Sequence, residues 1–80
     1  MSQKQLRLVV TFHTTAEAMA TERLCRANGL EGRLIPVPRC LTSDCGMAWS
    51  APAELRETLP ALLRANGVET AGFYELSLRG

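Results

Sequence analysis

The sequence is poor in the features that mark most functional classes. Nine basic and eight acidic side chains leave a formal charge of +1, so the chain carries no broad positive field for nucleic acid. No apolar stretch approaches the roughly 20 residues that span a bilayer. Residues 1–12 lack the apolar core and the cleavage site of a signal peptide. We therefore expect a cytoplasmic protein that binds neither nucleic acid nor membrane.

Cysteine and histidine are also scarce. Three cysteines are too few, and odd in number, for a disulfide framework. Zinc sites usually have four ligands with tighter cysteine spacing, whereas this chain offers only His13, Cys40 and Cys45. No nucleotide-binding loop, Ser-His-Asp set or paired-carboxylate motif is present, so the sequence offers little basis for a self-sufficient enzyme. We expect no bound cofactor or metal. A carrier, which other proteins load and unload, demands less of the chain than an enzyme does.

The residues that are present suit one small domain over residues 1–80, with residues 1–5 expected to be flexible. Hydrophobic residues make up 46% of the chain, and only one Trp, one Tyr and two Phe are among them, so the core should be mainly aliphatic. Residues 6–12 are rich in β-branched types and predict a strand. A helical apolar period follows, with Thr14 or Thr15 as the N-cap and Asn28-Gly29 as the stop.

The second half of the chain repeats this alternation. Residues 32–38 predict a short strand, whose prolines place it at a sheet edge. Residues 47–52 predict a third strand, and residues 53–67 predict a helix that Pro60 should kink or split. Residues 68–78 predict a last strand, with a bulge at Gly72. The segments "LCRANGLE" (24–31) and "LLRANGVE" (62–69) resemble each other, which is consistent with two similar halves.

This β-α-β-β-α-β order is typical of the ferredoxin-like fold, an α+β sandwich in which a four-stranded antiparallel sheet carries two helices on one face. In that topology the end of the first strand, the start of the first helix and the loop between the second and third strands meet at one edge. The residues that this arrangement should bring together are His13, Thr14, Thr15, Arg39, Cys40 and Cys45.

Cys45 is the strongest candidate for chemistry. It lies in a polar turn, "TSDCG", rather than in an apolar run. A thiol becomes a good nucleophile when a positive charge or a helix N-terminus stabilises its thiolate, and Arg39 and the first turn of the first helix are predicted to lie nearby. Gly46 would let backbone amides approach the sulfur, whereas Asp44 opposes a thiolate. The alternative is a partly buried turn cysteine with no role.

The other candidates have two interpretations each. Cys40 is either a resolving thiol that attacks a Cys45 adduct or an inward-facing residue at a strand end. His13 either packs locally or carries protons beside a thiolate. Thr14 and Thr15 either cap the helix or contact an anion. Cys25, within the helix, should behave as a small hydrophobic residue.

Three stretches, "TFHTTAEAMATE", "GRLIPVPR" and "SDCGMAW", resemble the small family of selenium/sulfur carrier-like proteins, long described as a domain of unknown function. The most specific part of the resemblance is Pro36, Pro38, Arg39, Cys45 and Gly46. It implies a protein that holds sulfur or selenium on Cys45, as a persulfide or perselenide, and exchanges it with donor and acceptor proteins. Cys40 stands where the family tends to have a polar or charged residue.

Two other functions fit the residues. A ferredoxin-like sheet commonly leaves a face or an edge open, so the protein could be a non-catalytic binding module or a homodimer formed through that face or edge. Alternatively, Cys40 and Cys45 could form a redox switch.

Overall fold

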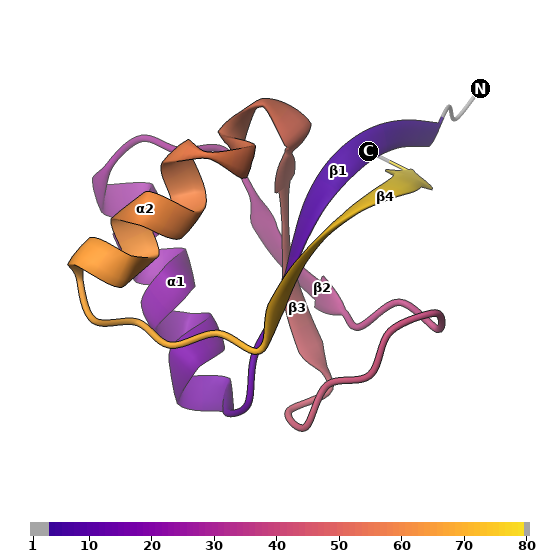
Figure 1. The fold of residues 1–80 in the computed structure, drawn as a ribbon, viewed down its shortest axis with the longest axis horizontal. Helices are drawn as coiled ribbons and strands as arrows, with labels where there is room; N and C mark the ends of the chain where they lie inside the picture. Colours follow the sequence, from indigo (N-terminus) through magenta and orange to yellow (C-terminus); the bar gives the residue numbers. More distant parts are fainter. Residues whose placement is uncertain (1–3, 80) are drawn as a thin grey trace.

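One antiparallel sheet organises the chain. In the computed structural model, which describes residues 4–79, the strands are β1 (Lys4–Thr11), β2 (Arg33–Pro36), β3 (Met47–Pro52) and β4 (Gly72–Arg79), in the sheet order β2-β3-β1-β4. The helices are α1 (Thr15–Ala27), a 3₁₀ helix (Ala53–Arg56) and α2 (Thr58–Ala65). Both α-helices lie on one side of the sheet, and the loop between β2 and β3 extends to the other side (Figure 1). The predicted α+β ferredoxin-like fold is therefore confirmed.

The second half of the central strand β1, residues 7–11, is buried on both faces, which explains its apolar run of Leu8, Val9 and Val10. Leu8, Val10 and Phe12 belong to the cluster between sheet and helices, which also contains Trp49 of β3 and Leu59 of α2. The residues between them point to the other face of the sheet but are equally inaccessible, since Val9 is 0% and Thr11 is 1% exposed. The end of β1 is thus a rigid base for the segments that follow it.

Helix α1 begins with a reciprocal capping box. The Thr14 side chain accepts a hydrogen bond from the Glu17 amide at 3.2 Å, and Glu17 Oε1 accepts from the amides of His13 and Thr14 at 2.8 and 3.3 Å. Thr14 is therefore the N-cap. The helix ends at Asn28 and Gly29, where Gly29 takes a φ of +67° that other residues rarely adopt.

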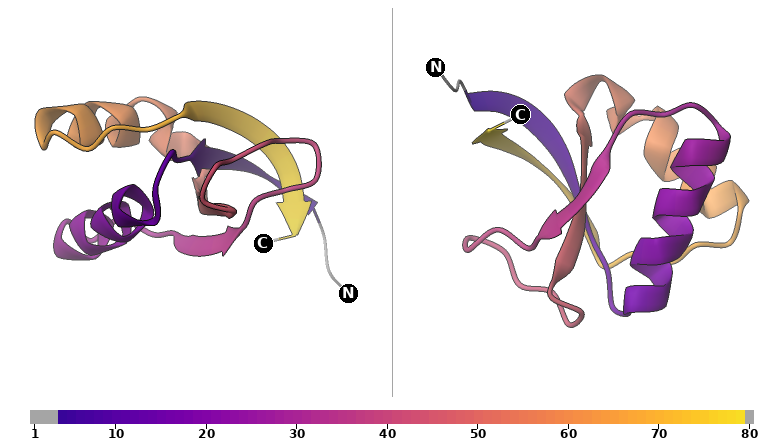
Figure 2. Two further views of the ribbon diagram at one scale, coloured as in Figure 1. Left: turned by 90° about the horizontal axis from the view of Figure 1, so that it is seen from below. Right: turned by 180° about the vertical axis from the view of Figure 1, so that it is seen from behind.

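Pro60 splits the second helical segment, as predicted. Proline has no amide hydrogen, and its ring clashes with the carbonyl four residues earlier in a continuous helix. That residue is Arg56, the last residue of the 3₁₀ helix, and α2 starts two residues later at Thr58. Figure 2 shows the short 3₁₀ segment turned away from the axis of α2.

Three strands have boundaries that differ from the predictions. Strand β1 runs from Lys4 to Thr11 instead of over residues 6–12. Strand β2 is confirmed at the sheet edge but ends at Pro36 instead of residue 38. Strand β4 begins at Gly72 instead of residue 68, because the amide of Val68 still closes the end of α2 on the Leu63 carbonyl at 2.9 Å. The predicted bulge at Gly72 is wrong, since β1 and β4 pair without interruption from Thr11↔Gly72 to Lys4↔Arg79.

The first residues of β1 and the edge strand β4 concern two further predictions, the flexible N-terminus and the homodimer. Residues 1–3 of the segment expected to be flexible lie outside the described residues, while Lys4 and Gln5 are the first residues of β1. Strand β4 forms the other sheet edge, where Phe73 and Tyr74 are 39% and 40% exposed. Homodimer formation through the sheet stays a prediction.

Candidate functional site

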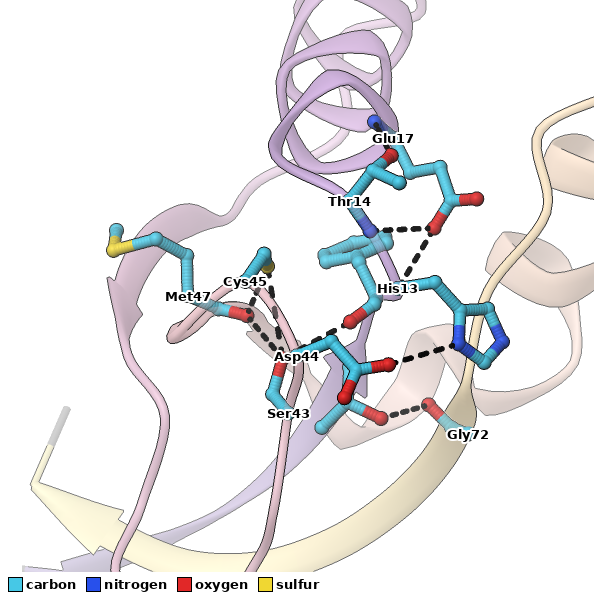
Figure 3. A network of polar contacts seen from close by, with 10 residues as sticks. His13, Thr14, Glu17, Ser43, Asp44, Cys45, Met47 and Gly72 are labelled. Carbon is cyan, nitrogen blue, oxygen red and sulfur yellow. Dashed lines mark hydrogen bonds and ion pairs between the residues drawn. The ribbon is translucent and has the colours of Figure 1, made fainter.

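The loop between β2 and β3 (residues 37–46) meets the start of α1 next to Cys45. Ser43 Oγ donates a hydrogen bond to the Phe12 carbonyl at 3.0 Å. His13 Nδ1 lies 3.6 Å from Asp44 Oδ2, and both side chains are more than half exposed. We call this meeting point of Phe12, His13, Ser43, Asp44 and Cys45 the Cys45 corner; it is drawn in Figure 3. The topology thus brings β1, α1 and the loop together as expected.

The thiol of Cys45 lies at the boundary between the core and this polar corner. Its residue is half-buried and packs against the hydrophobic cluster under the sheet. Cys45 Sγ donates to the Met47 carbonyl at 3.4 Å, and Ser43 Oγ lies 3.6 Å from the same sulfur. The sulfur therefore faces two oxygen atoms, one that can only accept a hydrogen bond and one that can also donate (Figure 3).

Gly46 shapes the turn that presents this thiol. Its φ is +76°, a region that side chains with a Cβ rarely occupy. Its amide donates to the Ser43 carbonyl at 3.4 Å, and its carbonyl accepts from the Val37 amide at 3.0 Å. The loop is thereby closed just before Pro36↔Met47, the first pair of the β2–β3 ladder. The Gly46 amide therefore closes the turn; its predicted approach to the sulfur stays a prediction.

Side chains of Thr14 and Glu17 bind the backbone amides at the start of α1. The amides of His13 and Thr14, which precede the first helical turn, bind the Glu17 carboxylate, and the Glu17 amide binds Thr14. Thr15, the first helical residue, is exposed. The amides of His13 and Thr14 thus have the Glu17 carboxylate as their partner and the Glu17 amide has the Thr14 hydroxyl, so none of these three donates to the Cys45 sulfur.

Arg39 and Cys40 lie in the outer part of the loop. Both are exposed, and they follow each other in a turn closed by the Leu41 amide on the Pro38 carbonyl at 2.9 Å. Among residues 4–79, neither side chain takes part in a hydrogen bond or an ion pair. All three thiols are free. In the described part of the chain, neither Arg39 nor Cys40 forms a hydrogen bond with Cys45, and Cys40 forms no disulfide with it. The proposed roles of Arg39 and Cys40 stay predictions.

Cys25 differs from the two loop cysteines. It is 0% exposed inside α1 and belongs to the core cluster. Burial raises the pKa of the Cys25 thiol, because the charged thiolate would lose its hydration. This environment agrees with the prediction of a small hydrophobic residue.

Ser43 is the residue of this corner that the sequence interpretation missed. Its hydroxyl lies within reach of Phe12 and Met47 carbonyls and of Cys45 Sγ. Serine in a turn commonly bonds to the backbone nearby, so the "TSDCG" turn did carry a signal. The contact with Phe12, 31 residues away, was not readable from that signal.

A small pocket adjoins the corner. It has a volume of about 260 Å³ and is lined by Thr11, His13, Thr42, Ser43, Asp44, Ala71 and Tyr74. Its wall is largely polar, and Ser43 connects it with the Cys45 sulfur. Cys45 is not one of its lining residues, so Ser43 is the link between this pocket and the thiol.

Two other kinds of site are not found in the described part of the chain. Residues 4–79 contain no group of three or more His, Cys, Asp and Glu side chains placed to hold a metal ion. None of the helices formed by these residues is long and apolar enough to cross a membrane.

Fold and site together define a small ferredoxin-like domain that presents one half-buried cysteine on a glycine-closed loop. The family model described as "Putative Se/S carrier protein-like" matches residues 7–75. The chain therefore belongs to this family, as its sequence motifs indicated. No curated protein and no solved structure matches the chain.

Proposed function

We propose that this protein carries sulfur or selenium on Cys45 and passes the atom to an acceptor protein. The observation that carries the proposal is the position of the Cys45 thiol, half-buried at the edge of the core and 3.6 Å from the hydroxyl of Ser43, a residue that lines a polar pocket. The family match supports the cargo class. Among the described residues, the polar neighbours of the Cys45 sulfur are the Ser43 hydroxyl and the Met47 carbonyl. This setting suits a thiol that other proteins load and unload better than a catalytic site with its own acid and base.

The transfer is a thiol exchange at a terminal sulfur. The Cys45 thiol loses its proton to solvent, and its thiolate attacks the terminal sulfur of a donor persulfide, R–S–SH. The S–S bond of the donor breaks, the donor leaves as the thiolate R–S⁻, and Cys45 becomes Cys45–S–SH. An acceptor thiolate then attacks the terminal sulfur and releases the Cys45 thiolate. No oxidant is consumed, because the transferred sulfur keeps its oxidation state. Selenium follows the same path only from a donor of the type R–S–SeH.

The loop supplies the remaining proposed roles. Arg39 is exposed near the corner and can attract the negative charge of a donor or of its leaving thiolate. Cys40 could act as a resolving thiol by attacking the inner sulfur of Cys45–S–SH, which would release HS⁻ and leave a Cys40–Cys45 disulfide. An exposed free thiol such as Cys40 persists in a reducing compartment, so we propose that the protein acts in the cytoplasm.

Sulfur loading tests the proposal directly. The protein is incubated with a cysteine desulfurase and cysteine, and its intact mass is measured without reductant. We expect Cys40→Ser to gain one sulfur and Cys45→Ser to gain none. The wild type should hold as much sulfur as Cys40→Ser if Cys40 takes no part, and less sulfur with a Cys40–Cys45 disulfide if Cys40 is a resolving thiol. Loading that persists in Cys45→Ser, or that is absent from Cys40→Ser, contradicts the proposal.

A further inference from the structure

We infer that Ser43 is a switching hydrogen-bond donor for the Cys45 sulfur, and that it stabilises the anion formed when the thiol is deprotonated or loaded. This inference rests on the proposed function, because it assigns a residue to the carrier step. It is drawn from the contacts of a single hydroxyl group. Ser43 Oγ lies 3.0 Å from the Phe12 carbonyl oxygen, 3.4 Å from the Met47 carbonyl oxygen and 3.6 Å from Cys45 Sγ.

One proton cannot serve these three neighbours together. In the resting thiol, the arrangement that satisfies most groups has Ser43 donating to Phe12 at the shortest distance and Cys45 donating to Met47 at 3.4 Å. Both carbonyls are acceptors only, and in this arrangement each receives a hydrogen from one side chain. In the resting corner, two donors thus serve two acceptors.

Loss of the thiol proton changes this balance. The sulfur becomes an acceptor, and the Met47 carbonyl then faces it with like partial charge. Among residues 4–79, the hydroxyl of Ser43 is the one side-chain donor that lies within hydrogen-bond distance of Cys45 Sγ. A rotation about the Cβ–Oγ bond turns its hydrogen from Phe12 to the sulfur without moving the backbone. Hydrogen bonds to a charged partner are about twice as strong as neutral ones, so the anion favours this rotation.

The same rotation serves a persulfide. The outer sulfur of Cys45–S–S⁻ is one bond beyond the half-buried Sγ, and Ser43 both lies 3.6 Å from Sγ and lines the adjoining polar pocket. Its hydroxyl is therefore placed to donate to the loaded anion. The backbone amides of His13 and Thr14 cannot take this part while they bind Glu17.

Charged and titratable groups near the Cys45 corner also influence how easily the Cys45 thiol loses its proton. The charged or titratable side chains of the segments that meet here are His13, Glu17, Arg39, Cys40 and Asp44. None of them is changed by a substitution at Ser43. A neutral change at Ser43 therefore isolates the effect of the hydroxyl from the effect of charge.

The test uses alkylation of Cys45 in a Cys40→Ser background, where Cys45 is the remaining accessible thiol. Rates with iodoacetamide are measured by mass spectrometry as a function of pH for the parent, Ser43→Ala, Ser43→Thr and Thr42→Ala. Thr42 is the matched control, because its hydroxyl is exposed, lines the same pocket and makes no hydrogen bond among the described residues. Sulfur loading by a desulfurase is measured on the same variants.

We expect Ser43→Ala to alkylate about tenfold more slowly than the parent near neutral pH and to reach the parent rate at high pH, as loss of a hydrogen bond to a charged group implies. Ser43→Thr and Thr42→Ala should follow the parent. An unchanged profile in Ser43→Ala overturns the inference, as does a loss of equal size at every pH, which would indicate a distorted loop. If Ser43→Ala does not fold, Ser43→Thr decides, since slow alkylation with the hydroxyl present contradicts the role.

Loading separates this inference from the carrier proposal. If Ser43→Ala shifts alkylation but the parent takes up no sulfur, the carrier function is wrong while the hydroxyl still acts on the Cys45 sulfur. If the parent loads sulfur and Ser43→Ala loads and alkylates like it, the carrier function stands and the role of Ser43 is overturned. If Ser43→Ala both alkylates and loads more slowly than the parent, Ser43 acts in the carrier step.

Discussion

Gly32 lies directly against the indole ring of Trp49. A Cβ atom added at Gly32 would lie 2.6 Å from three ring atoms, closer than non-bonded atoms approach. Trp49 is 1% exposed and pairs with Leu34 across β2 and β3. Gly32, just before β2, therefore lets the backbone lie directly on the indole of β3. These two strands support both ends of the loop that carries Cys45.

Gly32→Ala should therefore destabilise the protein by about 1–3 kcal/mol, the usual cost of overpacking a core. The free energy of unfolding in urea measures this effect. Gly29→Ala is the control, since its φ is also positive but no atom lies within 4 Å of the added Cβ, and it should cost about 1 kcal/mol from backbone strain. A smaller loss for Gly32→Ala than for Gly29→Ala would show that the indole moves aside easily.

The capping box of α1 gives a second prediction, which separates stability from reactivity. Thr14→Ala removes the acceptor for the Glu17 amide and should lower the free energy of unfolding by about 1 kcal/mol. Thr15→Ala, at the exposed next position, should change it little. Neither change should alter the alkylation rate of Cys45. A slower Cys45 reaction in the folded Thr14→Ala protein would instead support the role of Thr14 in the site.

Burial of Cys25 predicts a specific dependence of stability on pH. Because burial raises the pKa of this thiol in the folded state, the folded protein binds its proton more tightly than the unfolded chain does. The associated stabilisation is complete below the pKa of the unfolded chain and is lost as the pH rises through the higher folded value. The free energy of unfolding should therefore fall above about pH 9.

The comparison with Cys25→Ala isolates this term from other groups that titrate in the same range. The variant should be less stable at neutral pH, because it leaves a small cavity, but its stability should fall less steeply between neutral and alkaline pH. Parallel curves for the two proteins would contradict a proton held by burial. Alkylation provides a second readout, since Cys25 should react only when the protein unfolds.

The redox-switch alternative can be tested with the same reagents. Cys40 is exposed, whereas the Cys45 sulfur is engaged with Met47 and Ser43 at the edge of the core. We expect free-thiol titration in a glutathione buffer to show Cys40 oxidising to a mixed disulfide before Cys45 reacts. The comparison of Cys40→Ser with the wild type shows whether the two thiols act as a pair. Their simultaneous oxidation to an internal disulfide would favour the switch.

Several features of the fold were predictable because they depend on local chemistry. Asn28-Gly29 ends α1 through the left-handed conformation of Gly29. Pro60 splits the second helical segment because it cannot continue a helix that begins at residue 53. The start of β4 was mispredicted because Val68, which looks like a strand residue, bonds to the Leu63 carbonyl at the end of α2, and the chain first meets β1 where the Ala71 amide binds the Thr11 carbonyl.

The candidate site likewise has features that local sequence predicts and features that only tertiary packing decides. The amino-acid sequence by itself determined the order of the elements, the family and the choice of Cys45, because apolar periodicity, proline and glycine positions and a short motif are all local. Only the tertiary structure decided what surrounds the thiol. The capping box of Thr14 and Glu17 is local to the start of α1. The contact of Ser43 with the Phe12 carbonyl, by contrast, joins residues 31 positions apart. It places Ser43 Oγ between Phe12 and Cys45, and it depends on how β1 and the loop pack and not on any one segment.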